Sequence, residues 1–206
     1  MRRVHQSGDR GQTLPMYVVV VGGLLFLAFV YFAFAQAAVA RNGGQSAADA
    51  AALAAAQDVR DELTQGFFDD IANPETLADW LDAKGFEGSG EGAAAQLAAS
   101  NRSDLSGIQF AWVQGDPAFT ANIETQYTVG KSLLPGTEGT HARAHATAVI
   151  EPLCAIAPDA DLAKLVVIDC RGSGVWELDP KDIADVDPGA LPKAKDLFSV
   201  HLAEGQ

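Results

Sequence analysis

No charged residue stands between Arg10 and Arg41, and this uncharged run limits the fold of the chain more than any other feature. Its densest part is LPMYVVVVGGLLFLAFVYFAFAQAAVA, residues 14–40. About 20 apolar residues cross the hydrocarbon core of a bilayer as a helix, and unpaired backbone groups are costly in lipid. Pro15 suits the first turn of such a helix, where its missing N–H is not needed. We therefore expect residues 14–40 to form a transmembrane helix.

Two other interpretations of this run remain open. A cleaved signal peptide has an apolar stretch of roughly 7–15 residues, which is shorter than this run, although AFAQAA at residues 33–38 has the small residues of a cleavage site. A buried helix of a soluble protein is the other alternative, but the run is apolar on every side instead of along one stripe.

The charges that flank the run predict its orientation. Arg2, Arg3 and Arg10 precede it with only Asp9 opposing them, and positive residues stay on the cytoplasmic side. We expect residues 1–13 to be a cytoplasmic tail and residues 41–206 to be extracytoplasmic. That part carries 11 Lys and Arg (14 minus 3) against 26 Asp and Glu (27 minus 1), a net charge near −15. Such an acidic chain argues against nucleic acid as a partner and against close binding to anionic lipid headgroups.

Cys154 and Cys170 are the only cysteines of the chain, and both lie in the part expected outside the cytoplasm. An oxidising compartment makes a disulfide between them the first expectation. A zinc site and two free buried thiols remain as alternatives, although the CxxC spacing typical of zinc sites is absent.

Directly after the apolar run the composition changes to alanine, the best helix former. Ala52, Ala56, Val59, Leu63 and Phe67 recur at steps of three and four, which predicts one apolar stripe on a helix over residues 41–68. We expect this helix to continue the membrane segment almost without interruption, from about residue 14 to 66. The segment Asn42-Gly43-Gly44 is the weak point of this helix, and a break or kink there is the alternative.

The remaining chain, residues 69–206, is expected to be one α+β domain. Helices are predicted from Pro74 to just before Gly85 and over 93–101, with a flexible link at 88–92. Residues 107–115, 121–130 and 140–152 alternate with period two or run apolar, which predicts an antiparallel meander packed on the helix. Further strands are predicted within 163–172 and 195–203, and a turn or short helix after Trp176.

Residues 10–57, RGQTLPMYVVVVGGLLFLAFVYFAFAQAAVARNGGQSAADAAALAAAQ, resemble the N-terminal segment of TadE/TadG-like proteins of the tight-adherence, Flp-type pilus system. The likeness to actinobacterial versions is greatest. The resemblance implies a pilin-like, pseudopilin-like architecture, in which a long helix is half in the membrane and half packed on an antiparallel sheet. It covers about 50 of the 206 residues, and the rest of the chain shows no family motif.

The segment GQTLPMY, residues 11–17, bears on whether a peptidase removes the N-terminal tail. Pilins of this system resemble a pattern of Gly, four residues and Glu-Tyr, and a membrane peptidase cuts after the Gly. Gly11, Gln12 and Tyr17 fit that pattern, while Met16 stands where the pattern has Glu and cannot offset a new α-amino charge within lipid. Cleavage after Gly11 is therefore one interpretation. The other is that Gly11 ends a cytoplasmic tail and Tyr17 is an interfacial anchor.

Candidate catalytic or metal-binding residues are few. His141, Arg143 and His145 alternate on a predicted strand and so share one face, which we interpret as a solvated face, with a metal site as the alternative. The acidic cluster that ends at Asp187 lacks the pattern of a calcium loop. The three tryptophans are expected in the core. We expect no enzyme activity, no cofactor, no metal and no small-molecule substrate.

The expected function is structural. The chain is predicted to be a single-pass membrane component, TadG-like or a minor pseudopilin, of a tight-adherence pilus or related secretion assembly. Its partners would be the membrane and other pilus subunits. The alternative is a tethered extracytoplasmic binding or sensor domain unrelated to pili. Small residues permit close helix approach, so the predicted packing interface comprises Gly22, Gly23, Ala48, Ala51 and Ala52.

Overall fold

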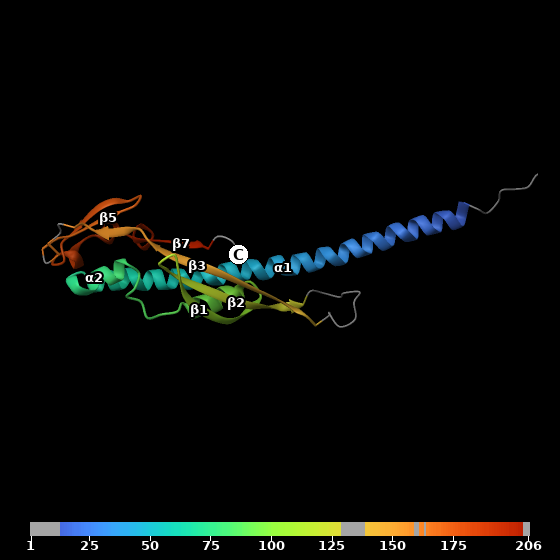
Figure 1. The fold of residues 1–206 in the computed structure, drawn as a ribbon, viewed down its shortest axis with the longest axis horizontal. Coiled ribbons are helices and arrows are strands. Elements are labelled where there is room, and N and C mark those ends of the chain that lie inside the picture. The colour runs from blue at the N-terminus through green and yellow to red at the C-terminus, as the bar shows by residue number, and fades with distance from the viewer. Residues whose placement is uncertain (1–12, 129–138, 159–160, 163, 204–206) are drawn as a thin grey trace, which may run out of the picture.

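A single long helix organises the computed structural model, which describes residues 13–128, 139–158, 161–162 and 164–203 (Figure 1). Helix α1 runs without a break over Thr13–Asp69, 57 residues, or about 85 Å at 1.5 Å per residue. A mixed helix and sheet domain surrounds its second half, whereas its first half projects alone (Figure 1). The α+β class, with a long N-terminal helix followed by an antiparallel sheet, is confirmed.

The main sheet has four antiparallel strands in the order β1-β2-β3-β7. They are β1 (Ser103–Val113), β2 (Asp116–Thr128), β3 (His141–Pro152) and β7 (Phe198–Leu202). The expected meander is therefore correct, and the expected closing strand pairs with β3. Gln114 and Gly115 form the turn between β1 and β2 with φ of 55° and 100°, values that suit a two-residue hairpin with the right-handed twist of the strands.

A second, three-stranded sheet lies at the end of the domain far from the free helix, where Figure 1 labels β5. Its order is β4-β5-β6, with β4 (Cys154–Ile156), β5 (Val166–Cys170) and β6 (Gly174–Leu178). Trp176 lies inside β6 and pairs with Ile168, and the turn that was expected after it spans residues 180–182, beyond the end of β6. The short 3-10 helices η1 (Ile183–Asp185) and η2 (Pro188–Ala190) follow later.

Three short helices complete the domain. Helix α2 (Pro74–Leu81) is capped by the Asn73 side chain, which accepts a hydrogen bond from the N–H of Glu75. Helix α3 spans Glu91–Ser100, and α4 spans Ala194–Leu197. The segment before α3 is not the free link that the glycines suggested, because Glu62 accepts hydrogen bonds from the N–H groups of residues 87 and 88, at 2.8 and 3.1 Å.

The core lies between α1 and one face of the main sheet. Helix α1 packs on β2 and β3, while α3 lies against both α1 and β1. The predicted stripe is confirmed, since its five members have no exposed surface, and alanines on α1 bring the helix close to alanines on the strands. The buried residues of this interface include Ala48, Ala52, Ala55, Ala56, Val59, Leu63, Phe67, Phe119, Ala121, Ile123, Ala146, Ala148 and Ile150.

Candidate functional site

The first half of α1 presents large apolar side chains with nothing of this chain to cover them. From Pro15 to Val39 most side chains are exposed, for example Leu25 at 66% and Phe29 at 53%. We call residues 15–39 the stem. Among the described residues, α1 is the one helix long and apolar enough to cross a membrane, and its most apolar window is wholly unburied. Exposure of this kind is stable only in a non-aqueous surrounding or against another protein.

The small residues of the stem lie open. Gly22 and Gly23 are exposed, and a Cβ added to either would meet no atom within 4 Å. Because they have no side chain, the backbone of a second helix can approach closely at these two positions. Met16 and Tyr17 are also exposed, at 74% and 71%, near the start of the stem. Gly11 and Gln12, on which the processing hypothesis depends, lie outside the described residues.

Ala48, Ala51 and Ala52 occupy a different environment. All three have no exposed surface and belong to the core formed with the sheet of this same chain. The contacts these three alanines make are therefore within the chain's own core. Of the predicted packing interface, Gly22 and Gly23 are the residues that stay open to another subunit.

The stem joins the domain at Gly43 and Gly44, where α1 is continuous and no break occurs. A Cβ on Gly43 would overlap the hydroxyl of Tyr127, and a Cβ on Gly44 would lie 3.4 Å from Thr125 Cγ2. The continuous helix agrees with the prediction, and the alternative of a break at these glycines is wrong. The glycines let the ends of two strands lie directly against the helix, since a Cβ on Gly43 would displace the Tyr127 ring and a side chain larger than alanine on Gly44 would press on Thr125.

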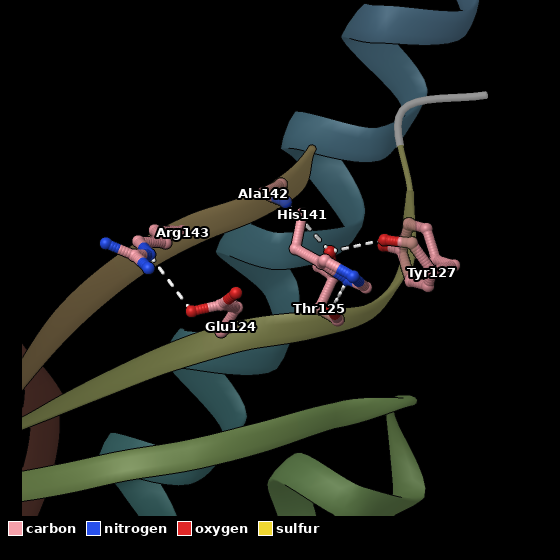
Figure 2. Close-up of polar contacts among 6 residues, drawn as sticks. All are labelled: Glu124, Thr125, Tyr127, His141, Ala142 and Arg143. Carbon is pink, nitrogen blue, oxygen red and sulfur yellow. Dashed lines mark hydrogen bonds and ion pairs between the residues drawn. The ribbon is translucent and has the colours of Figure 1, made fainter. Parts of the chain in front are cut away.

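A network of polar contacts fixes the strand ends at this junction (Figure 2). Thr125 is buried, and its hydroxyl donates to the carbonyl of Tyr127 at 2.7 Å and accepts from the N–H of Ala142 at 2.9 Å. The His141 ring nitrogen Nδ1 contacts the Thr125 carbonyl. These contacts replace the regular ladder, because the register of β2 and β3 shifts between Glu124 and Thr128. The strands therefore stay joined up to the point where the stem emerges.

Ala142 and Ala144 lie against the helix at Gly44, and His141, Arg143 and His145 of the predicted face alternate with them along β3. Arg143 is exposed, and its Nε donates to Glu124 at 3.0 Å (Figure 2). Within the described residues no three His, Cys, Asp or Glu side chains are placed to hold a metal ion.

The tryptophans are not all in the core as expected. Trp80 is partly buried, and its indole N–H donates to Asp70 at 2.8 Å. Trp176 is partly buried as well, packed against the core. Trp112 is 50% exposed, so its expected place in the core was wrong. It lies on β1, which is an edge strand, and makes an edge-on contact with Phe110.

The disulfide between Cys154 and Cys170 is present, so this prediction is confirmed. The two residues face each other on the adjacent strands β4 and β5, and both are buried in the core. The bond therefore crosslinks two neighbouring strands of the small sheet. With both sulfurs in this bond, the zinc and free-thiol alternatives are excluded.

One pocket, of about 300 Å³, gathers titratable groups that the sequence did not bring together. Asp116, Glu151 and His201 line it, from the start of β2, the end of β3 and β7. Burial raises the pKa of Asp116 above its ordinary value, and the charge of Glu151 raises it further. Arg171 limits this effect, since it lowers the pKa of Asp116 and donates to Glu151 at 2.8 Å. The register of three strands places these residues together, which no local sequence pattern could reveal.

Comparison with known proteins adds one result, on the stem and the beginning of the packed helix. The family model of the TadE/G-like Flp pilus-assembly (Tad) proteins matches residues 11–58, and so covers none of the sheet. No curated protein and no solved structure matches the chain. The match supports a role in pilus assembly for a chain with a candidate membrane helix.

Proposed function

We propose that this chain is a membrane-anchored accessory component of a tight-adherence, Flp-type pilus or a related secretion assembly. In this proposal it is TadG-like or a minor pseudopilin, and it acts by packing its stem against helices of other subunits. It performs no catalysis and carries no cofactor. The surface of the domain supplies further contacts with partners outside the membrane.

The observation that carries the proposal is the coincidence of the family match with the stem. The matched residues, 11–58, include the whole stretch that has no partner in this chain. Between subunits in lipid, close contact depends on van der Waals packing at small residues and not on the hydrophobic effect. Gly22 and Gly23 supply such a place, because neither is covered by this chain.

The orientation follows from charge and from the disulfide. The three arginines before the stem favour a cytoplasmic N-terminus, as the positive-inside rule describes. The Cys154–Cys170 disulfide supports an oxidising location for the domain, because such bonds persist outside the cytoplasm. A membrane-impermeant reagent that modifies domain lysines in intact cells tests this orientation, and protection until the cells are lysed would contradict it.

The assembly role is tested by filling the open place on the stem. Gly22→Leu with Gly23→Leu should reduce co-purification with other pilus components and the number of pili per cell. Ala28→Leu is the matched control, because it adds a leucine to an exposed position of the same helix. Unchanged co-purification and normal pili in the glycine variant would contradict the proposal, and so would an equal loss in the control.

Processing after Gly11 is a separate question for the same proposal. N-terminal sequencing of the membrane-bound protein distinguishes three results. A start at Gln12 indicates a peptidase that acts as it does on pilins, a start near residues 36–40 indicates a secreted domain, and an intact tail indicates a simple anchor. The secreted form would remove the stem and with it the packing role.

The pocket of Asp116, Glu151 and His201 favours a second candidate, a tethered domain that binds a small polar ligand outside the cell. The neighbouring genes discriminate between the two candidates. A secretion ATPase and pilin-like genes beside this one would support assembly, and their absence would favour the binding domain.

A further inference from the structure

Two hollows flank α1 at the place where the stem leaves the domain. One, of about 500 Å³, lies between Val39 and Gly43 of the helix and Arg102 and Tyr127 of the domain. The other, of about 550 Å³, lies between Phe34 and Arg41 of the helix and the beginning of β3. Corresponding helix residues of the two hollows, such as Val39 and Arg41, are two positions apart. Two positions correspond to about 200° around the helix axis at 3.6 residues per turn. The hollows therefore open on opposite sides of the helix.

The charges in these hollows have one sign, although the chain is acidic. Arg102 lines the first, and Arg41 and Arg143 line the second together with His141. No Asp or Glu belongs to the described lining of either hollow. We call Arg41, Arg102, His141 and Arg143 the basic collar. Glu124 is the acid paired with it, at 3.0 Å from Arg143, whose side chain is still 81% exposed. In a protein of net charge −13, this local excess of positive charge needs a reason.

The position of Arg41 along α1 gives a reason for this positive charge. Tyr17, near the start of the stem, and Gln36, the one polar side chain in its outer part, are 19 residues apart, or about 29 Å along a helix. This length matches the roughly 30 Å hydrocarbon core of a bilayer. Arg41 then lies about 8 Å beyond the core, at the depth of the lipid headgroups.

The aromatic residues beside the collar suit the same depth. Tyr127 lies against Gly43 with its ring below the Arg102 guanidinium, 4.9 Å from the ring centroid. Phe32 and Phe34 line the two hollows from the stem side and are exposed. Aromatic rings are enriched at the membrane interface, where one edge contacts lipid chains and the other contacts water.

We propose that the basic collar binds the phosphate groups of anionic phospholipid in the leaflet next to the domain. Arg102 receives one headgroup on its side of the helix, while Arg41 and Arg143 receive another on the opposite side. The total charge argued against such binding, but the collar lies where the stem leaves the described part of the domain, and the charge close to the membrane surface determines lipid attraction. This inference rests on the membrane anchor of the proposed function and is independent of pilus assembly.

The test uses the full chain in a nonionic detergent with equal amounts of phosphatidylglycerol and phosphatidylcholine, and native mass spectrometry counts the lipids retained. We expect phosphatidylglycerol to be retained in about fivefold excess or more, a ratio that corresponds to the attraction of a single basic residue. The variant with Arg41→Gln, Arg102→Gln and Arg143→Gln should retain the two lipids equally. The variant with Arg60→Gln, Lys84→Gln and Arg171→Gln removes the same charge elsewhere and should keep the preference.

Several results would overturn the proposal. They are no preference in the unaltered protein, a preserved preference in the collar variant, and an equal loss in the charge-matched control. Displacement of the lipid by inorganic phosphate at the same concentration would assign the collar to free phosphate instead. Should the triple variant fail to fold, Arg41→Gln alone, at an exposed helix position, must still lower the ratio. No pilus component takes part, so failure here leaves the assembly proposal standing, and a failed assembly test leaves this one standing.

Discussion

The two halves of α1 have one backbone conformation and opposite surroundings. The stem carries valine, leucine and phenylalanine and leaves most of them exposed, while the half from Ala40 to Asp69 has alanine as its commonest residue and buries most of it. Large side chains need a partner that adapts to their shape, as lipid does. Alanines have little surface to bury, but they let a sheet approach until backbone and side chains are in contact. The difference teaches that the alanine-rich stretch of this helix marks where its own sheet packs closely, while large apolar residues occur in both halves.

The largest expected effect separates the two halves by removing one phenylalanine from each. Phe67→Ala should lower the free energy of unfolding by about 3–5 kcal/mol, because it leaves a cavity at a site with no exposed surface. Phe29→Ala, at a site 53% exposed, should change it by less than about 0.5 kcal/mol. Denaturant unfolding of the full chain in detergent, followed by near-ultraviolet circular dichroism, measures both. Similar losses in the two variants would remove the distinction between stem and domain.

Removal of the disulfide tests how much the domain end far from the stem contributes to the free energy of unfolding. Cys154→Ala with Cys170→Ala should cost about 3 kcal/mol of unfolding free energy, since a bond that closes a loop of this length restricts the unfolded chain by about that amount. Reductant should have the same effect on the unaltered protein and none on the double variant. A stability that is indifferent to both treatments would show that the small sheet contributes nothing to the cooperative unit.

Leucine substitutions of two glycines of α1, Gly44 at the junction and Gly22 in the stem, test the same difference between the two halves. Gly44→Leu should cost about 1–3 kcal/mol, because even a Cβ there would touch Thr125, Ala142 and Ala144, and more atoms would force the sheet away. Gly22→Leu should leave unfolding unchanged, since nothing lies within 4 Å of that position. The same measurement applies, and a destabilised Gly22 variant would mean that the stem is packed on a part of its own chain.

The smallest expected effect is the dependence of stability on pH. Residues 11–40 include no carboxylate, so this effect comes from the domain and not from the stem. The pKa of Asp116 is raised above 3.8, chiefly by burial, so between 3.8 and the raised value the folded state holds more protons than the unfolded state. Stability contributed by this group is therefore lost as pH rises through that window. Asp116→Asn should be slightly more stable than the unaltered protein at pH 7 and equal to it near pH 3. Unfolding curves at both pH values check this, and a variant less stable at pH 7 would contradict it.

Sequence periodicity predicted those parts whose structure depends on neighbours along the chain. The stripe from Ala52 to Phe67 and the meander follow from periods of 3.6 and two, and the disulfide follows from there being one possible pair of cysteines. Strand β4 was missed because three residues are too few to establish a period, and β6 was missed although β5 and β7, which were predicted, are equally short. Trp112 was misplaced because a tryptophan on an edge strand has the same local sequence as one in a core.

By itself, then, the amino-acid sequence determined a long helix, an apolar stem with charged residues at both ends, an acidic α+β domain and a crosslink. Each of these follows from composition or spacing within one segment. The tertiary structure alone decided that Gly43 and Gly44 lie against Tyr127 and Thr125 at the strand ends, and that Ala48, Ala51 and Ala52 belong to the chain's own core. It also decided that Arg41, Arg102 and Arg143, from three distant segments, surround the base of the stem. Such positions depend on which segments pack together, and packing is a property of the whole chain that no local stretch of sequence contains.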